Sequence, residues 1–475
     1  MDEVSNKEII KKYVDIISQE KLPVGETEYN ELDLNIDEIS WIVFNIKNFN
    51  KLFTKPGITD NQILVKLYEL IVGFGLTNFI KGEERDYSSS DFPYTASNAV
   101  KCFKYCDHLL HSCKDLLLEV ERNKAQIIIK SLILCATHSD VHIWSSDYSK
   151  KSSLDFLKSL LSFSNHDDLP SLLCDDSFYP TIFKRILKEI RPYFEMDKWY
   201  KNPSSCYIFS WFLLQVKHPY LADYLCEVFS PPHIFMLDSH QKCHHLIAIQ
   251  CFSHILDNVP PTLIKIDNRA DVIYSLLKGY THSSDEDIIA ALAPCFLKLP
   301  DFKYQKLTQI SWNRYDEFLN VLLIRADMEC KLHIKLLYLS HIHSFIQILP
   351  PFKHLKRLWK VIEDGLLKDS NPLCLITTLK ILKDVIRSCW PRMSYYCFRI
   401  LKCLAIFLED FDEQKYTDKC EVEVIHKLCE ECLFLLKCAS KEEFEGIVTK
   451  YIEDTKDVDA LCVKVLKSVI DKTES

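Results

Sequence analysis

The sequence predicts an all-α fold in which short helices stack into a solenoid. Apolar-periodic segments recur about every 44 residues in the C-terminal half, beginning near Asp238, Asp285, Asp327, Asn371 and Asp418. Prolines interrupt most of these segments midway, at Pro260, Pro300, Pro350 and Pro391. The chain of 475 residues has only 8 glycines, too few for a β-rich or nucleotide-binding fold with many tight turns.

Each recurring segment is therefore expected to hold one helix, a short turn and a second helix. A helix pair in about 40–47 residues is typical of HEAT/armadillo-like repeats. Such repeats stack on their neighbours and present extended surfaces that bind other proteins.

The N-terminal half is also predicted to be helical, but its helices are less regular. We expect helices near 4–19, 36–53, 60–80, 97–121, 124–137, 151–164, 181–195 and 204–228. Residues 81–93 are charged and serine-rich and end in a proline, which predicts a loop. Pro231-Pro232 is the strongest predicted break, so we expect an irregular region at 1–230 and a regular array at 231–475.

The segment 375–408 illustrates the packing expected in the array. One helix face carries Leu375, Leu379, Leu382, Ile386 and Cys389 at helical spacing, and Trp390-Pro391 then ends the helix. The next segment, 393–408, is apolar nearly all round and is expected to lie buried between neighbours. Asn268 and Asp271 predict the start of a helix over 269–277, with Asn268 as its N-cap.

Composition argues against several functional classes. The net charge is −9 and no long basic block occurs, so nucleic acid is not an expected partner. The start lacks a hydrophobic signal segment, and the richest apolar run, 206–216, is short for a membrane span of about 20 residues. We therefore expect a cytoplasmic and nuclear protein whose 20 cysteines are mostly reduced and buried.

Histidine and cysteine clusters are interpreted as packing rather than as metal ligands, and no cofactor is expected. His426 and Cys432 lie about 120° apart around a helix, so His426, Cys429 and Cys432 do not converge on one ion. The cysteines at 102, 106 and 113 follow a core stripe. The cluster at 240–245 is denser, but it too precedes a packing stripe. His341, alone on an apolar face, is expected to be a hydrogen-bonded core residue.

The sequence also lacks the common catalytic motifs. No G-x-S-x-G, H-E-x-x-H, G-x-G-x-x-G or phosphate-loop pattern occurs, so we expect no enzyme and no catalytic residues.

Five short segments, taken together and in order, resemble one HEAT-repeat family over roughly 240–440. They are 254–260 (HILDNVP), 268–274 (NRADVIY), 354–358 (HLKRL), 379–384 (LKILKD) and 389–392 (CWPR). The chain resembles the family of TELO-two-interacting protein, member two (Tti-two), a subunit of the TTT complex with Tel-two and Tti-one. The N-terminal half resembles that family only in being helical.

The resemblance implies a non-catalytic scaffold with Tti-one-like and Tel-two-like partners. It implies an indirect role with the ninety-kilodalton heat-shock chaperone and its RuvB-like adaptor. That role is to support the maturation and stability of phosphatidylinositol-3-kinase-related kinases (mTOR, ATM, ATR and relatives). A general HEAT-repeat adaptor, resembling a transport receptor or a phosphatase scaffold, is the alternative. A zinc-dependent enzyme is a weaker one.

Four residues are candidates either for contacting a partner or for tying repeats together: Arg269, Arg357, Trp390 and Arg392. We expect Arg269 and Arg392 to join adjacent repeats through carboxylates or helix-end carbonyls. Trp390 is expected in the core, with an interface anchor as the alternative, because tryptophan and arginine dominate binding hot spots.

Overall fold

The computed structural model is built from helices and turns, and the described residues contain no strand. It describes residues 12–13, 15–16, 22, 32, 34–44, 60–77, 85–113, 121–195, 199–283, 285–299, 312–348, 350–411, 418–454 and 461–471. The chain packs into two compact units, Met1–Ile266 (unit 1) and Asp267–Ser475 (unit 2). This boundary lies C-terminal to the division expected at 230/231.

Unit 1 is organised around one helix that is apolar on nearly every side. This helix is α8 (Glu121–Thr137), and it contacts α5 (Asp60–Phe74), α9 (Asp147–Ser164), α11 (Ile182–Ile190) and α12 (Ser205–Gln215). Its buried residues include Ile127, Ile128, Leu132, Ile133 and Leu134. A helix that is apolar all round is stable only when neighbours cover it, so the other helices surround α8.

The remaining helices of unit 1 differ widely in length, from 5 residues in α10 to 18 in α6, and they are irregularly connected. They are α3 (Ile36–Phe44), α6 (Thr95–Ser112), α10 (Leu169–Leu173), α13 (Leu225–Pro231), α14 (Lys242–Asn258) and α15 (Pro261–Lys265). Short 3-10 segments and one π-helix, Pro232–Met236, join several of them.

Two expectations about unit 1 are wrong. Pro231-Pro232 does not break the chain, because α13 runs to Pro231 and the π-helix continues from Pro232. The expected helix at 204–228 is interrupted after Gln215, where extended Val216 is followed closely by Pro219 and a 3-10 turn. Proline removes a backbone donor and restricts the residue before it, which accounts for this break. Most of the expected helix at 4–19 lies outside the described residues, although residues 12–13 and 15–16 are helical. Residues 81–84 of the expected loop at 81–93 also lie outside them.

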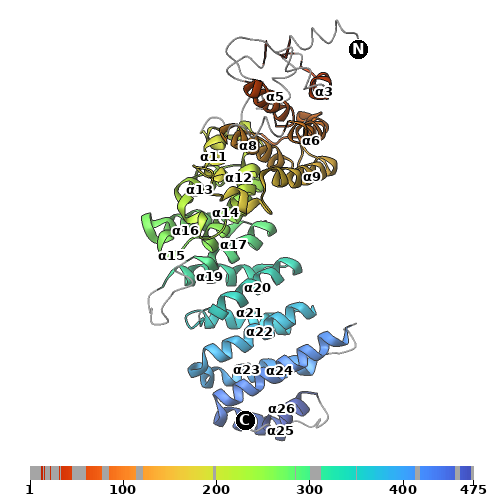
Figure 1. The fold of residues 1–475 in the computed structure, drawn as a ribbon. Coiled ribbons are helices and arrows are strands. Elements are labelled where there is room, and N and C mark those ends of the chain that lie inside the picture. Colours follow the sequence, from red (N-terminus) through yellow and green to blue (C-terminus); the bar gives the residue numbers. More distant parts are fainter. Residues whose placement is uncertain are drawn as a thin grey trace. The chain divides into compact units, whose positions relative to one another are not determined.

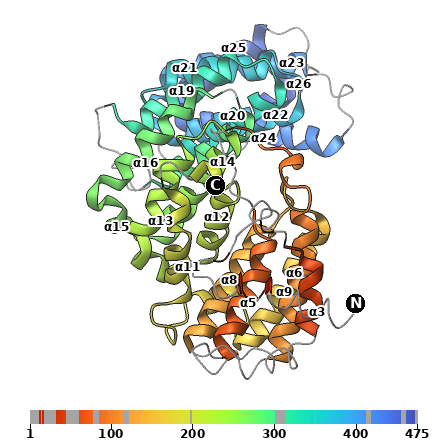
Figure 2. The same cartoon turned by 90° about the horizontal axis from the view of Figure 1, so that it is seen from above.

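Unit 2 is a regular array of two helix layers. The first layer holds α19 (Arg314–Met328), α21 (Leu355–Leu367), α23 (Met393–Asp410) and α25 (Lys441–Asp454). The second layer holds α20 (Leu332–Ile348), α22 (Pro372–Ser388) and α24 (Lys419–Ala439). Each helix contacts the next helix of its own layer, and Figure 2 shows the two layers side by side. Helices α16 (Arg269–Lys278) and α17 (Glu286–Lys298) precede this array, and α26 (Leu461–Asp471) packs on α23, α24 and α25 (Figure 1).

Side-chain caps begin several of the helices where the recurring pattern predicts a start. Asn371 accepts hydrogen bonds from the amides of Leu373 and Cys374, and Asp418 and Asp285 cap α24 and α17 in the same way. Asp327 instead lies in the last turn of α19. Asn268 stands at the N-cap of α16 with a φ of 55°, and its side chain makes no cap bond, so that part of the expectation is wrong.

The helices of adjacent layers approach closely where α21 meets α22. A methyl group added at Gly365 would lie 2.7 Å from the Thr378 hydroxyl oxygen and 3.1 Å from its methyl carbon. Thr378 is fully buried and β-branched, so it has little room to move. Glycine at 365 is therefore what allows the two helices to touch.

We predict that Gly365→Ala lowers the free energy of unfolding by about 1–3 kcal/mol through overpacking. The matched control is Gly446→Ala on α25, where nothing lies within 4 Å of the added methyl. Alanine should stabilise that helix by up to about 1 kcal/mol. Urea unfolding of both variants checks this, and equal midpoints would contradict the packing account.

Two buried histidines make the stability dependent on pH. Burial lowers the pKa of His138 to about 4, despite a hydrogen bond from its Nε2 to the Gly75 carbonyl at 2.7 Å. Burial also lowers the pKa of His341 to about 4, and its ring bonds to the backbone of Ile289. His341 is 8% exposed, which confirms that it is a core residue, but its Nε2 atom has no hydrogen-bond partner among the described residues.

Because the unfolded chain binds these protons near pH 6.5 and the folded chain only near pH 4, stability falls as the pH drops through this window. We predict that lowering the pH from 7.5 to 5.5 costs about 1.4 kcal/mol for each of these histidines. His138→Gln should remove its share of this dependence, whereas His111→Gln on the exposed side of α6 should not. Urea midpoints at both pH values test this, and an unchanged dependence in His138→Gln would refute it.

Candidate interaction surface

Among the described residues of unit 2, the most exposed aromatic side chains lie on one face of α23. Tyr395 is 85% exposed and Phe398 is 63% exposed. Arg399 and Lys402 follow at the next helical positions, so the four side chains share one stripe. We call Tyr395, Phe398, Arg399 and Lys402 the α23 face.

The α23 face is open because the neighbours of α23 cover only its other sides. Its buried residues are Met393, Cys397, Ile400, Leu401, Cys403, Leu404, Phe407 and Leu408. These pack in a helix that contacts α21, α24, α25 and α26. The expectation that 393–408 is buried all round is therefore wrong for this face, since a helix of the first layer keeps one side in solvent.

One of the two cations on the α23 face is held in place by an ion pair with the preceding repeat. The Arg399 guanidinium donates two hydrogen bonds to the Glu363 carboxylate of α21, at 2.5 and 2.7 Å. Among the described residues, Lys402 has no ion-pair partner. The face thus presents two aromatic rings, one anchored guanidinium and one unpaired ammonium group.

The four residues singled out in the sequence occupy different environments. Trp390 lies in the 3-10 turn before α23 and is 38% exposed, so the expectation that it belongs to the core is wrong. Arg392 donates to the Phe352 carbonyl at 2.9 Å and lies 5.3 Å from the Phe352 ring centroid. This bond joins the turn before α23 to the loop before α21.

Of the other two arginines, one bonds to the preceding helix of its layer and one pairs with a residue close to it in sequence. Arg357 of α21 donates to the side-chain oxygen of Asn320 on α19. Arg269 pairs at 3.0 Å with Asp267, which lies only two residues before it. Contact of any of the four candidates with a partner stays a prediction.

A ladder of polar contacts between successive helices was missed by the sequence reasoning. In the first layer, Lys360 pairs with Asp327 at 2.6 Å, and Arg399 pairs with Glu363. In the second layer, His343 contacts Asp384 at 3.0 Å and Lys383 pairs with Glu431 at 2.8 Å. These partners are 33 to 48 residues apart in sequence, so opposite charges separated by about one repeat are the signal that could have found them.

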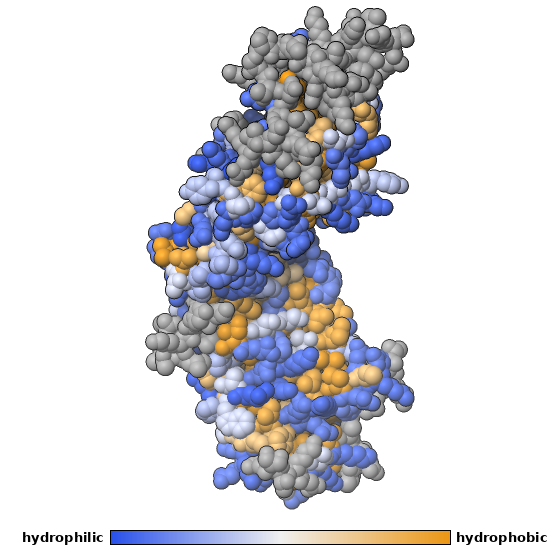
Figure 3. Space-filling model, in the orientation of Figure 1, coloured by the Kyte–Doolittle hydropathy of each residue, from blue (hydrophilic) through white to orange (hydrophobic). Residues whose placement is uncertain are grey.

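A second exposed apolar surface lies on the other layer of unit 2. Figure 3 shows hydrophobic residues gathered over α20 and α22. The large apolar side chains of these helices that are most exposed are Leu332, Ile348 and Leu373, at 45%, 40% and 51%. These side chains are aliphatic and less exposed than the rings of the α23 face.

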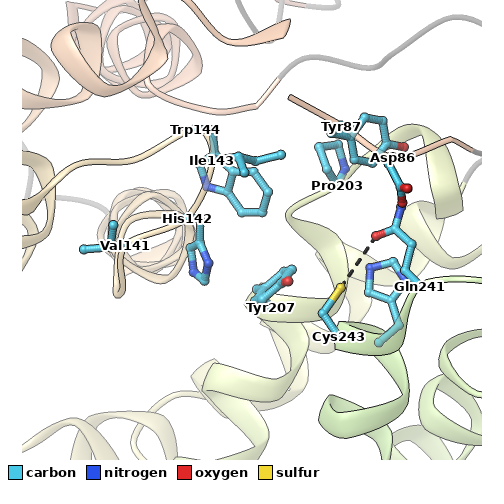
Figure 4. Close-up of a pocket in the computed structure, with 11 residues that line it drawn as sticks. Asp86, Tyr87, Val141, His142, Ile143, Trp144, Pro203, Tyr207, Gln241 and Cys243 are labelled. Atoms are coloured by element: carbon cyan, nitrogen blue, oxygen red, sulfur yellow. Dashed lines mark hydrogen bonds between the residues drawn. The ribbon is translucent and has the colours of Figure 1, made fainter. Parts of the chain in front are cut away.

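Unit 1 contains an aromatic pocket of about 560 Å³ (Figure 4). The His142 ring lies against both Trp144 and Tyr207, with ring centroids 4.9 and 4.4 Å apart. The Trp144 indole nitrogen donates to the Thr137 carbonyl at 2.9 Å, which fixes the ring. Burial lowers the pKa of His142, so its ring is neutral near pH 7, while Asp86 and Gln241 add polar groups to the pocket lining.

The histidine and cysteine clusters do not form a metal-binding geometry among the described residues. Cys429 and Cys432 are buried in α24, and His426 instead packs edge-on against Phe411. Burial raises the pKa of the Cys135 and Cys403 thiols to about 12, so these sulfurs stay protonated and unreactive near pH 7. His244 bonds to Ser239 at 2.8 Å within unit 1.

In the part of the chain that is described, no helix has the length and apolarity needed to cross a membrane.

Solved structures with similar helix arrangements include karyopherin Kap121p bound to RanGTP and Kap121p bound to Ste12p. The TM-scores are 0.46 and 0.47, with 12% identity in each case, and the matches cover 98% of this chain and 45% of those chains. The all-α solenoid is established here by the two helix layers themselves.

Sequence comparison identifies relatives, although no family model matches the chain. TELO2-interacting protein 2 of Mus musculus is 26% identical over 339 residues, and that of Homo sapiens is 26% identical over 342 residues. Both matches cover 68% of this chain, but they span 65% of the mouse protein and 66% of the human one. The resemblance seen in residues 254–392 is thereby confirmed, and the chain is a homologue of the mammalian proteins named TELO2-interacting protein 2.

Proposed function

We propose that this chain is a non-catalytic scaffold subunit of a TTT-like complex. Its relatives are named for interaction with TELO2, which supports a Tel-two-like partner. The resemblance in residues 254–392 further supports a Tti-one-like partner and a co-chaperone role for phosphatidylinositol-3-kinase-related kinases. That role implies work in the cytoplasm and the nucleus with the ninety-kilodalton heat-shock chaperone and its RuvB-like adaptor.

The observation that carries this proposal is the exposed aromatic α23 face. Burying a large apolar side chain stabilises a protein or a complex by about 1.5–3 kcal/mol. Tyr395 and Phe398 do not gain this free energy while they are exposed to water. Tyrosine, tryptophan and arginine are the residues that dominate protein–protein hot spots. An aromatic pair beside Arg399, with half-exposed Trp390 in the preceding turn, therefore suits a protein partner better than solvent.

The α23 face is also held in a defined position before any partner arrives. Arg399 is fixed by Glu363, and the Tyr396 ring lies 5.3 Å from the buried Trp359 of α21. A surface fixed in this way loses little conformational entropy on binding. We therefore propose that the partner contacts the α23 face. Arg357 of α21 and Arg392 in the turn before α23 are candidates for contacts at the rim of this interface.

The first prediction is that the chain is recovered in soluble, stable form chiefly when it is co-expressed with Tti-one-like and Tel-two-like partners. Lowering its level in cells should reduce the abundance of the kinases without changing their transcripts. Affinity purification with mass spectrometry and transcript measurement check both statements. Recovery of a Ran-family GTPase or phosphatase subunits without these partners would favour a general helical-repeat adaptor instead.

The second prediction concerns the α23 face. Tyr395→Ala with Phe398→Ala should weaken partner capture by about tenfold or more, because hot-spot truncations cost about 2 kcal/mol or more. Thermal stability should hardly change, since both rings are exposed.

Two control variants make this test specific. Tyr148→Ala removes a tyrosine that is 81% exposed in unit 1, and it should leave capture unchanged. Leu332→Ser with Leu373→Ser alters the second apolar surface. If that variant abolishes capture while the α23 variant does not, the partner contact has been placed on the wrong layer.

A further inference from the structure

A row of free cations lies along the exposed face of α11 in unit 1. Lys184, Lys188 and Arg191 follow at helical spacing, and all three are exposed. The opposite face is buried through Ile182, Phe183, Ile186, Leu187 and Ile190. Among the described residues, none of the three cations has an ion-pair or hydrogen-bond partner.

The groups around this row leave its positive charge uncancelled. Lys130 of α8 pairs with Glu189 at 2.5 Å, so these two charges neutralise each other. The Arg185 guanidinium donates to the carbonyls of Pro180 and Tyr179, at 2.9 and 3.0 Å, which holds it in place without removing its charge.

The row borders a groove of about 880 Å³. The charged residues that line the groove are the cations Lys130, Lys184, Arg185, Lys188 and Arg191 and the carboxylates Glu189 and Glu227. On a chain whose net charge is −9, this groove is a local region of positive potential.

An apolar pocket of about 450 Å³ adjoins the groove and shares Leu187, Arg191 and Glu227 with it. Its walls include Phe194, Phe209 and Phe235, and the Phe194 ring centroid lies 5.6 Å from that of Phe209. A volume of this size accepts a large apolar side chain.

We propose that this groove binds an acidic, extended peptide segment of a partner protein, with one aromatic or large aliphatic side chain in the pocket. Arg191 follows directly after α11, and at about 1.5 Å per residue Lys184 and Lys188 are about 6 Å apart along the axis and Lys188 and Arg191 about 4.5 Å. Alternate side chains of an extended peptide are about 6.6 Å apart. Carboxylates at every second position can therefore pair with Lys184, Lys188 and Arg191 together.

A single nucleic-acid strand fits the groove less well. Such strands bind by stacking bases on exposed aromatic faces. Phe194 and Phe209 are only 8% and 1% exposed, so they form a lined pocket rather than a stacking platform.

The test uses the full chain and a fluorescein-labelled peptide in which Glu alternates with Ser around one Phe. Fluorescence anisotropy should show salt-sensitive binding that Lys184→Glu with Lys188→Glu weakens by about tenfold or more. The control variant Lys104→Glu with Lys151→Glu makes the same charge change at two exposed lysines elsewhere in unit 1. Its affinity for the peptide should stay within about twofold of that of the unchanged chain. Replacing the peptide Phe by Ser should also weaken binding.

Alkylation of Cys226 gives a second measurement, because this exposed thiol lines the pocket. The peptide should protect Cys226 from iodoacetamide and leave exposed Cys330 of unit 2 unprotected. The proposal is overturned if the peptide does not bind, if both charge-reversal pairs weaken it equally, or if Cys226 stays unprotected. It is also overturned if a single-stranded oligonucleotide binds more tightly and protects Cys226.

Discussion

The structure of unit 2 depends on each helix burying its apolar stripe against the helix one repeat away in its own layer. Leu375, Leu379, Leu382 and Ile386 of α22 are at most 1% exposed, between α20 and α24. Burying each such side chain is worth about 1.5–3 kcal/mol, whereas an exposed ion pair contributes about 0.2–1 kcal/mol. Apolar packing therefore holds the layers together, and the ladder of polar contacts selects the register between helices.

The same constraint accounts for where the interaction surfaces lie. A repeat packs against its neighbours along the array and against the other layer, so one side of every first-layer helix remains in solvent. On α21 that side carries lysine and arginine residues that bond back to α19. On α23 that side carries Tyr395 and Phe398, whose exposure to water does not stabilise the fold. In unit 1 the exposed side of α11 is instead cationic, so the two units offer chemically different surfaces.

Helical content, the recurring starts and the core stripe of α22 could be predicted from the sequence because they depend on local periodicity. Caps at Asp285, Asn371 and Asp418 are likewise local. The exposure of Trp390, Tyr395 and Phe398 could not be predicted, since an aromatic helix does not reveal which of its sides lacks a neighbour. Pairs such as Arg399 with Glu363 could not be predicted without knowing the register between successive helices of a layer. The α11 groove could not be predicted either, because side chains from α8 and α13 also line it.

Hydroxyl-radical footprinting of the chain, alone and with a co-expressed TELO2 homologue and Tti-one-like partner, tests the central claim most directly. Oxidation of Tyr395 and Phe398 should fall strongly in the complex, while oxidation of exposed Tyr148 should not change. Equal oxidation of Tyr395 and Phe398 in the free and bound chain would contradict the placement of the partner on α23.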